Sequence, residues 1–178
     1  MIGVFDKQIT NRNFLSATGF KFNLARVPKV DFFSQTSSIP GINLGVAIQP
    51  TYLKDIPIHG DKLTFDYFNL RFVVDENLEN YLEIQNWMRG LGYPENIHEY
   101  DKWRLSDPVN PQQDPNLSDG SLIIYNSNFN PGAIITFQGM FPTSLSTLEF
   151  DATSPDVQYI TAQVSFKYAI YNIVKYES

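Results

Sequence analysis

The sequence has 178 residues, of which 43% are hydrophobic and 15% aromatic, enough for one domain with a packed core. This composition excludes a disordered polyampholyte and a collagen-like fibre. The net charge of −6 argues against strong electrostatic binding of nucleic acid. The absence of cysteine excludes disulfides, zinc–thiolate sites, iron–sulfur clusters and cysteine nucleophiles.

The chain shows no sign of a membrane or export segment. No stretch approaches the ~18 apolar residues of a membrane-spanning helix, and the first residues lack a basic segment followed by an apolar one. We therefore expect a soluble protein made in the cytoplasm, with no membrane partner. The charged fraction of 18% is below the average of roughly 25%. A surface poor in charge is typical of subunits that bury much surface in an assembly, although a β-rich monomer is an alternative.

Alternating apolar and polar residues predict strands in the first part of the chain. One strand is expected over 20–27, ended by a proline, and a second over 31–38, before the turn Ile39-Pro40-Gly41. Glycine and proline punctuate the apolar residues of 42–60, so we predict an extended arm there, a loop or long hairpin outside the core. A further strand is expected over 63–74.

One amphipathic helix is predicted over residues 76–89. Asp75 is a good N-cap, and Glu76 and Glu79 fall in the first turn, where the helix dipole favours acids. Apolar residues then recur mostly at spacings of three and four. Gly90 and Gly92 supply an expected C-terminal end.

The second half reads as a long loop followed by strands. Residues 93–119 contain four prolines and no periodicity, so a long loop is predicted. Strands are expected over 121–129 and 133–141, a break at Pro142, and one long last strand over 157–174. A strand of that length implies a large curved sheet or barrel. The predicted fold is α+β and mostly β, an antiparallel β-sandwich or barrel, in a single domain over 1–178.

The sequence offers no recognisable catalytic or metal-binding arrangement. His59 and His98 lie in separate segments, and neither has a histidine partner at ligand spacing. The acidic pairs near residue 76 are explained by the helix start, and there is no Gly-x-Ser-x-Gly elbow or phosphate-binding loop. We therefore predict no enzymatic activity, no cofactor and no metal. A glycosidase-like carboxylate pair is the least favoured alternative.

Several short stretches, taken in order, resemble the tail tube proteins of contractile-tailed, T4-like bacteriophages. Their order is more specific than any one of them. The similar stretches are Phe20–Leu24, Thr36–Gly41, Ile56–Asp66, Leu70–Glu76 leading into the helix, Phe137–Ser144, Leu148–Asp151 and the long terminal strand.

The resemblance implies a structural virion protein. Such subunits form six-membered rings that stack into the inner tube of the tail, a conduit for DNA. The implied partners are other copies of the chain, the tail sheath protein and the baseplate hub, with the tape-measure protein and DNA passing through the lumen without specific binding. The implied location is the tail of the virion, assembled in the host cytoplasm.

The loop 93–119 departs from the simplest tube subunits and leaves related roles open. These are a baseplate-proximal, tube-initiating ring, a neck or tube-terminating ring, and the tube of a type VI secretion or tailocin-like particle. A different class is a non-viral β-sandwich that binds a soluble ligand through exposed aromatics such as Tyr100 and Trp103.

Within this reading, the N-terminal arm (1–15) and the apolar arm (42–60) are expected to contact a neighbouring subunit or the next ring, because exposed apolar segments are ordinary in assemblies. The expected contact residues are Phe14, Leu15, Ile42, Val46, Ile48, Tyr52, Leu53, Ile56, Ile58 and Trp103. The polar face of the last strand is the candidate lumen lining, with Thr161, Gln163, Ser165 and Lys167.

Overall fold

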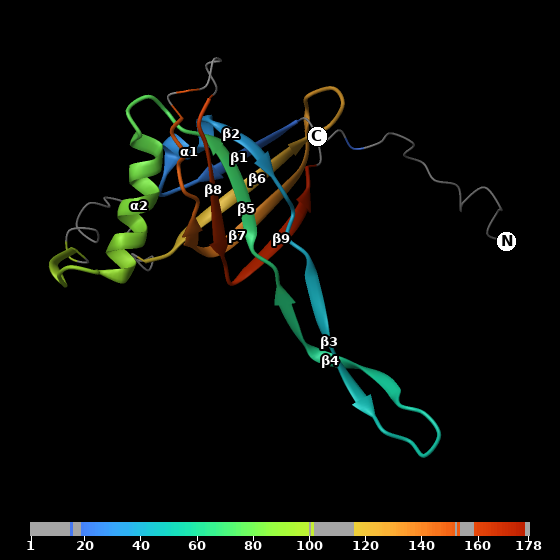
Figure 1. Ribbon diagram of the computed structural model, residues 1–178. Coiled ribbons are helices and arrows are strands. Elements are labelled where there is room, and N and C mark those ends of the chain that lie inside the picture. The colour runs from blue at the N-terminus through green and yellow to red at the C-terminus, as the bar shows by residue number, and fades with distance from the viewer. Residues whose placement is uncertain are drawn as a thin grey trace.

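The computed structural model describes residues 15, 19–99, 101, 116–151, 153 and 159–176 (Figure 1). Nine strands and two helices lie in these ranges. In chain order they are β1 (Phe20–Leu24), α1 (Pro28–Phe32), β2 (Ser34–Ser37), β3 (Ile42–Gln49), β4 (Ile56–Phe65), β5 (Phe68–Val73), α2 (Glu79–Gly92), β6 (Ser118–Tyr125), β7 (Pro131–Leu145), β8 (Thr161–Lys167) and β9 (Ile170–Lys175).

The strands form one large antiparallel sheet and a separate hairpin. The order in the large sheet is β1-β6-β7-β8-β5-β2, and β3 pairs with β4 alone. Strand β7 joins two halves, because its first part pairs with β6 and β9 and its last part pairs with β8. Figure 1 shows the strands of the two halves crossing one another as two layers, with α2 at one side. The predicted class, mostly β and antiparallel, is confirmed.

The core is aromatic and lies between these layers. Phe68 of β5 lies with its ring centroid 5.0 Å from that of Phe22 in β1 and 4.7 Å from that of Phe137 in β7. Phe166 of β8 stacks on the same group and lies 6.2 Å from the ring of Trp87, which is fully buried on α2. The helix therefore closes the aromatic core, and Trp87 is a packing residue.

The first half differs from the sequence prediction at three places. The first strand ends at Leu24, and the strand expected over 31–38 is shorter, because its first two residues belong to the short helix α1 and β2 covers only Ser34–Ser37. Pro28 has its φ preset for a first helical turn, and the alternation over 31–38 was too short to exclude a helix. The strand expected over 63–74 is two strands, because the chain leaves the hairpin at Phe65 and enters the core sheet at Phe68.

The predicted amphipathic helix exists but is displaced. It covers Glu79–Gly92, three residues later at each end than expected. Leu78, in the left-handed region with φ 59°, is the N-cap, and Asp75 is not. The buried side chain of Asn80 instead ties the helix start to the end of β5, since its Nδ2 donates to the carbonyl of Val73 at 2.9 Å.

The second half also departs from expectation at its breaks. The strand expected to end at Phe141 continues as β7 to Leu145, because a register shift between Pro142 and Ser144 accommodates the proline. The predicted single last strand is divided into β8 and β9. The chain turns at Tyr168–Ala169, so that β8 pairs with the last part of β7 and β9 with its first part. The turn also changes the facing of side chains, so Tyr171 is buried and Ile170 exposed.

Candidate assembly surface

The hairpin β3–β4 is an arm that projects from the body of the protein (Figure 1). We call residues 42–65 the arm. Its two strands pair from Ile42 opposite Phe65 to Gln49 opposite Ile56. Every residue of β3 is exposed, and in β4 only Gly60 and Phe65 are half-buried. The sequence placed an extended arm outside the core over 42–60, and the hairpin at this place runs from Ile42 to Phe65.

The arm carries large apolar side chains that stay 40% or more exposed in the described subunit. Ile42 and Leu44 alternate in the inner part of β3 and Val46 and Ile48 in its outer part, so each of these pairs lies on one face of its ladder. The tip is more exposed still, because Tyr52 has 102% and Leu53 94% of its surface accessible. A monomer that keeps so much apolar surface in water is unusual, and such surfaces mark contact sites.

The body holds the base of the arm by hydrogen bonds to backbone carbonyls. Tyr171 donates its hydroxyl to the carbonyl of Pro40 at 3.1 Å, and Tyr168 donates to the carbonyl of Asp66 at 3.0 Å. Lys167 reaches the carbonyl of Phe65 with its Nζ at 2.6 Å. All three donors come from the end of β8 and the start of β9, so the base is fixed to the core although the arm beyond it is free.

The environment of the arm base raises the pKa of one tyrosine, Tyr168. Burial, together with smaller electrostatic effects of the neighbouring Tyr171 and Asp66, raises the pKa of Tyr168 from its ordinary 10 to about 12. The phenol therefore stays protonated as a donor throughout the neutral range. The ring of Phe65 lies 6.0 Å from that of Tyr168 and 5.6 Å from that of Tyr171, which adds aromatic packing at the same point.

The predicted lumen residues of β8 lie opposite its core-facing side chains. Thr161 accepts hydrogen bonds from Arg71 of β5 at 3.1 and 2.8 Å, and Ser165 donates to Asn69 at 2.7 Å. Gln163 is exposed on the same face. Lys167 differs from these three, because its Nζ reaches the arm base and lies 4.5 Å from the ring centroid of Tyr67.

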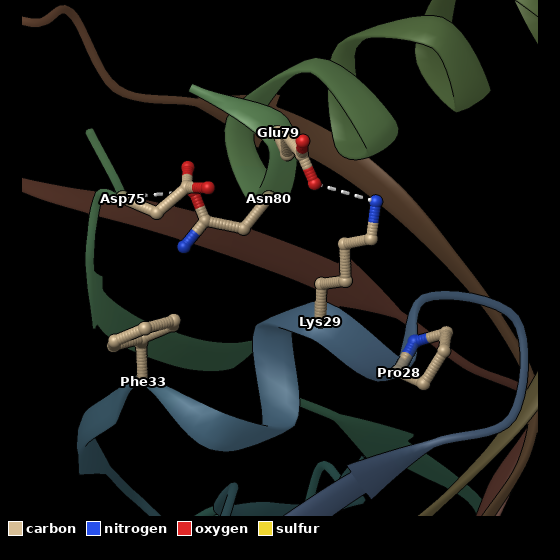
Figure 2. A pocket seen from close by; sticks show the side chains of 6 residues that line it. All are labelled: Pro28, Lys29, Phe33, Asp75, Glu79 and Asn80. Atoms are coloured by element: carbon tan, nitrogen blue, oxygen red, sulfur yellow. Dashed lines mark hydrogen bonds and ion pairs between the residues drawn. The ribbon is translucent and has the colours of Figure 1, made fainter. Parts of the chain in front are cut away.

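An open pocket of about 390 Å³ lies between α1 and the start of α2 (Figure 2). Lys29 points across it to α2, with its Nζ 2.8 Å from Glu79 and 3.1 Å from Glu83. Hydrogen bonds to these two glutamates raise the pKa of Lys29 to about 12. Phe33 and Asp75 also line the pocket. Lys29 of α1 is therefore paired with two glutamates of α2, and these ion pairs link the two helices across the pocket.

A second ion pair fixes the chain after α2. Arg89 bonds to Glu99 and lies 3.0 Å from Glu95, which raises the pKa of the guanidinium. Burial alone would raise the pKa of Glu99, but the hydrogen bond from Arg89 and backbone N–H groups lower it overall. The start of the predicted loop 93–119 is thereby attached to the helix. Its last two residues, Ser118 and Asp119, already belong to β6.

The structure brings most of the predicted contact residues together on the arm. Leu15 is exposed but lies apart in sequence from the arm, and Phe14 and Trp103 lie outside the described residues. Seven predicted contact residues share the arm and are exposed: Ile42, Val46, Ile48, Tyr52, Leu53, Ile56 and Ile58.

Sequence reasoning missed other exposed apolar residues. Leu44 and Leu63 sit opposite each other in the arm, and the alternation of β3 was a sufficient signal for Leu44. Ile173 and Val174 are exposed on β9, which pairs only with β7 among the strands described. No signal marked these two, because the turn that splits the last strand was not predicted.

The described residues contain neither a cluster of metal-binding side chains nor a membrane-spanning helix. Within 15, 19–99, 101, 116–151, 153 and 159–176, no group of three or more His, Asp or Glu side chains is placed to hold a metal ion. In the same ranges no helix has the length and apolarity needed to cross a membrane.

The fold matches chains from solved contractile injection systems. A chain of the anti-feeding prophage cap, a tube-terminating cap, is similar with a TM-score of 0.59 and 16% identity, over 98% of this chain and 100% of that one. A chain of the anti-feeding prophage baseplate has a TM-score of 0.58 and 13% identity, over 94% and 95%. A chain of the sheath–tube complex of the PVC extracellular contractile injection system has 0.56 and 15%, over 93% and 94%.

The chain has the fold of contractile-system tube and cap proteins. The resemblance to tail tube proteins that the sequence suggested is thus confirmed for the fold. No protein-family profile and no curated protein matches the sequence.

Proposed function

We propose that the protein is a structural subunit that assembles with copies of itself into rings, and that the rings stack into the inner tube of a contractile tail. The observation that carries the proposal is the apolar arm, exposed on a subunit with a tube-like fold. In the specific form that we favour, each ring contains six copies, the tube belongs to a phage tail, and its lumen conducts DNA. The role is structural, without catalysis.

The energetics support assembly through the arm. Burying one large aliphatic or aromatic side chain contributes about 1.5–3 kcal/mol. Several such residues lie along the arm with 40% or more of their surface accessible in the described subunit, so their exposed area can still be buried against another surface. A neighbouring subunit or the next ring is the surface that would cover them.

The sheet edges support closure between subunits. Strands β1, β2 and β9 each pair on one side only among the strands described. Unpaired edges bind other strands unless they are protected, and a barrel closed between subunits removes them. The polar face with Thr161, Gln163 and Ser165 is the surface we assign to the lumen. It offers hydroxyl and amide groups, with Arg71 as a cation held by Thr161.

A cap is the second candidate. The similarity to the tube-terminating cap covers the full length of that chain. In that role the protein would form one ring at the end of a tube, and one face of the ring would bind no further copy. The sheath protein and the baseplate hub are the other partners that a tube, tube-initiating or terminating ring would meet.

Negative-stain electron microscopy of the concentrated full chain, with light scattering on the same sample, tests the proposal. Tubes are expected for a tube subunit, and single rings that do not stack are expected for a cap. A particle of monomer mass at every concentration, with and without a crowding agent, would contradict self-assembly and favour the soluble binding module.

A matched variant tests the arm itself. Replacing residues 45–62 by Asn-Gly joins Leu44 to Leu63 through a two-residue hairpin turn, because these two residues are already paired. The shortened protein is expected to keep its circular dichroism spectrum and unfolding temperature and to lose assembly. Tubes or rings like those of the wild type would overturn the role of the arm.

A further inference from the structure

The arm is divided into two short ladders by an irregularity at its middle. Pairing is regular from Ile42/Phe65 to Leu44/Leu63 near the base, and again from Val46/His59 to Gln49/Ile56 near the tip. Between them Gly45 alone on β3 faces three residues of β4, Gly60 to Lys62. Extra residues in one strand bend it and increase the local twist. The direction of the outer ladder is therefore set at this point of the arm, whose two strands twist about each other in Figure 1.

The two glycines at the irregularity are not equivalent. A Cβ at Gly60 would lie 2.5 Å from the carbonyl oxygen of Gly45 and 2.8 Å from its carbonyl carbon. These are backbone atoms that no rotamer change can move. A Cβ at Gly45 would meet only the carbonyl oxygen of Lys62, at 3.6 Å, an ordinary contact. Neither glycine has a positive φ, so space and not backbone conformation requires a glycine at 60.

We propose that Gly60 is a positioning residue for assembly: its close approach to Gly45 aims the outer half of the arm, with Val46, Ile48, Tyr52 and Leu53, at the surface that covers it. Tyr168 and Tyr171 fix the base of the arm to the body. Between this base and the tip, the two strands lie so close at Gly45 and Gly60 that a side chain added at Gly60 would force them apart. This inference rests on the proposed role of the arm.

The first test measures the direction of the outer arm in the unassembled monomer. The chain has no cysteine, so spin labels can be placed on Leu53→Cys at the tip and Asn128→Cys in the exposed β6–β7 turn. Pulsed electron paramagnetic resonance then gives the distance distribution between the labels in dilute monomer. Gly60→Ala is expected to shift this distribution, and Gly45→Ala, the matched control, to leave it unchanged. An unchanged distribution in Gly60→Ala would overturn the proposal.

The second test measures assembly of the unlabelled chains. Gly60→Ala is expected to raise the concentration for half-maximal assembly about tenfold or more, since misplacing even one packed apolar side chain at an interface costs that much. Gly45→Ala is expected to assemble as the wild type. Both should unfold at the wild-type temperature, because the residues of the outer arm are exposed and lie outside the buried core.

The outcomes separate this inference from the proposed function. If the Asn-Gly shortened protein fails to assemble while Gly60→Ala assembles normally, the arm is needed but its aim is not, and the inference is wrong. If the shortened protein assembles normally, the proposed role of the arm is wrong, and Gly60 then has no positioning role in assembly.

Discussion

The arm and the aromatic core use the same kinds of residue in opposite environments. Phe22, Phe68 and Phe166 are fully buried between the layers, whereas Ile48 and Leu53 on the arm are mostly exposed. The core therefore stabilises the subunit, and the arm can lower the free energy only when another surface covers it. The comparison teaches that subunit stability and assembly are encoded in different segments and can be broken separately.

The largest expected effect on stability comes from the core. Phe68→Ala removes the ring that contacts Phe22, Phe137 and Phe166, and is expected to lower the free energy of unfolding by about 3–5 kcal/mol. Urea denaturation followed by circular dichroism measures it. Leu53→Ala on the arm, the matched apolar truncation, is expected to stay within about 0.5 kcal/mol of wild type. Equal losses in the two variants would contradict the separation of core and arm.

A smaller effect is expected where the core holds the arm. Tyr171→Phe removes the hydroxyl that donates to the carbonyl of Pro40 and keeps the ring in the core. The expected loss is about 1 kcal/mol, the net value of one hydrogen bond. The same urea titration measures it, and an unchanged midpoint would show that the bond is dispensable. Hydrogen exchange of the arm amides should rise in this variant and leave β6 and β7 unaffected.

The protonation of Tyr168 should make the contribution of the arm base to the free energy of unfolding depend on pH. Its pKa is raised by burial to about 12 in the folded protein, against about 10 in the unfolded chain. The unfolded chain therefore loses this proton first, so the contribution is intact below about pH 10 and is lost as the pH rises towards 12.

The measurement is the free energy of unfolding across that alkaline range, for the wild type and Tyr168→Phe. The wild type should lose stability faster with pH than the variant, and the difference isolates this group from the other tyrosines and lysines. Parallel curves would show that the phenol is not buried against the arm base.

The sequence predicted the regions that short-range patterns determine. Alternation located β1 and β5, and spacings of three and four located α2. The arm was recognised because glycines and prolines interrupt apolar residues that could not form a core strand. Exposure of Tyr52 and Leu53 followed from that reading, since a chain outside the core leaves its side chains in water.

The errors at the strand breaks of the second half occur where contacts distant in sequence decide the structure. Pro142 was expected to end a strand, but β8 continues to pair past it through a register shift. The last strand divides at Tyr168–Ala169 because its two parts pair with different halves of β7. Both depend on a partner strand that local pattern does not reveal. The hydrogen bonds from Tyr168 and Tyr171 to the arm base were unpredictable for the same reason.

The smallest expected effect on subunit stability comes from polar substitutions on the arm. These substitutions are the most informative about assembly. Ile48→Ser and Tyr52→Ser change side chains that lie in water in the described subunit, so the free energy of unfolding should stay within about 0.5 kcal/mol of wild type. Assembly should weaken strongly, because each variant removes apolar area from the proposed contact.

Light scattering against concentration measures this assembly, with Asn128→Ser as the control, an exposed change in a turn of the body. Wild-type assembly by both arm variants would place the contact elsewhere, with the exposed residues Ile173 and Val174 of β9 as the next surface to alter. Loss of stability in either arm variant would instead show that the arm is part of the folding unit, which would remove the distinction between arm and core.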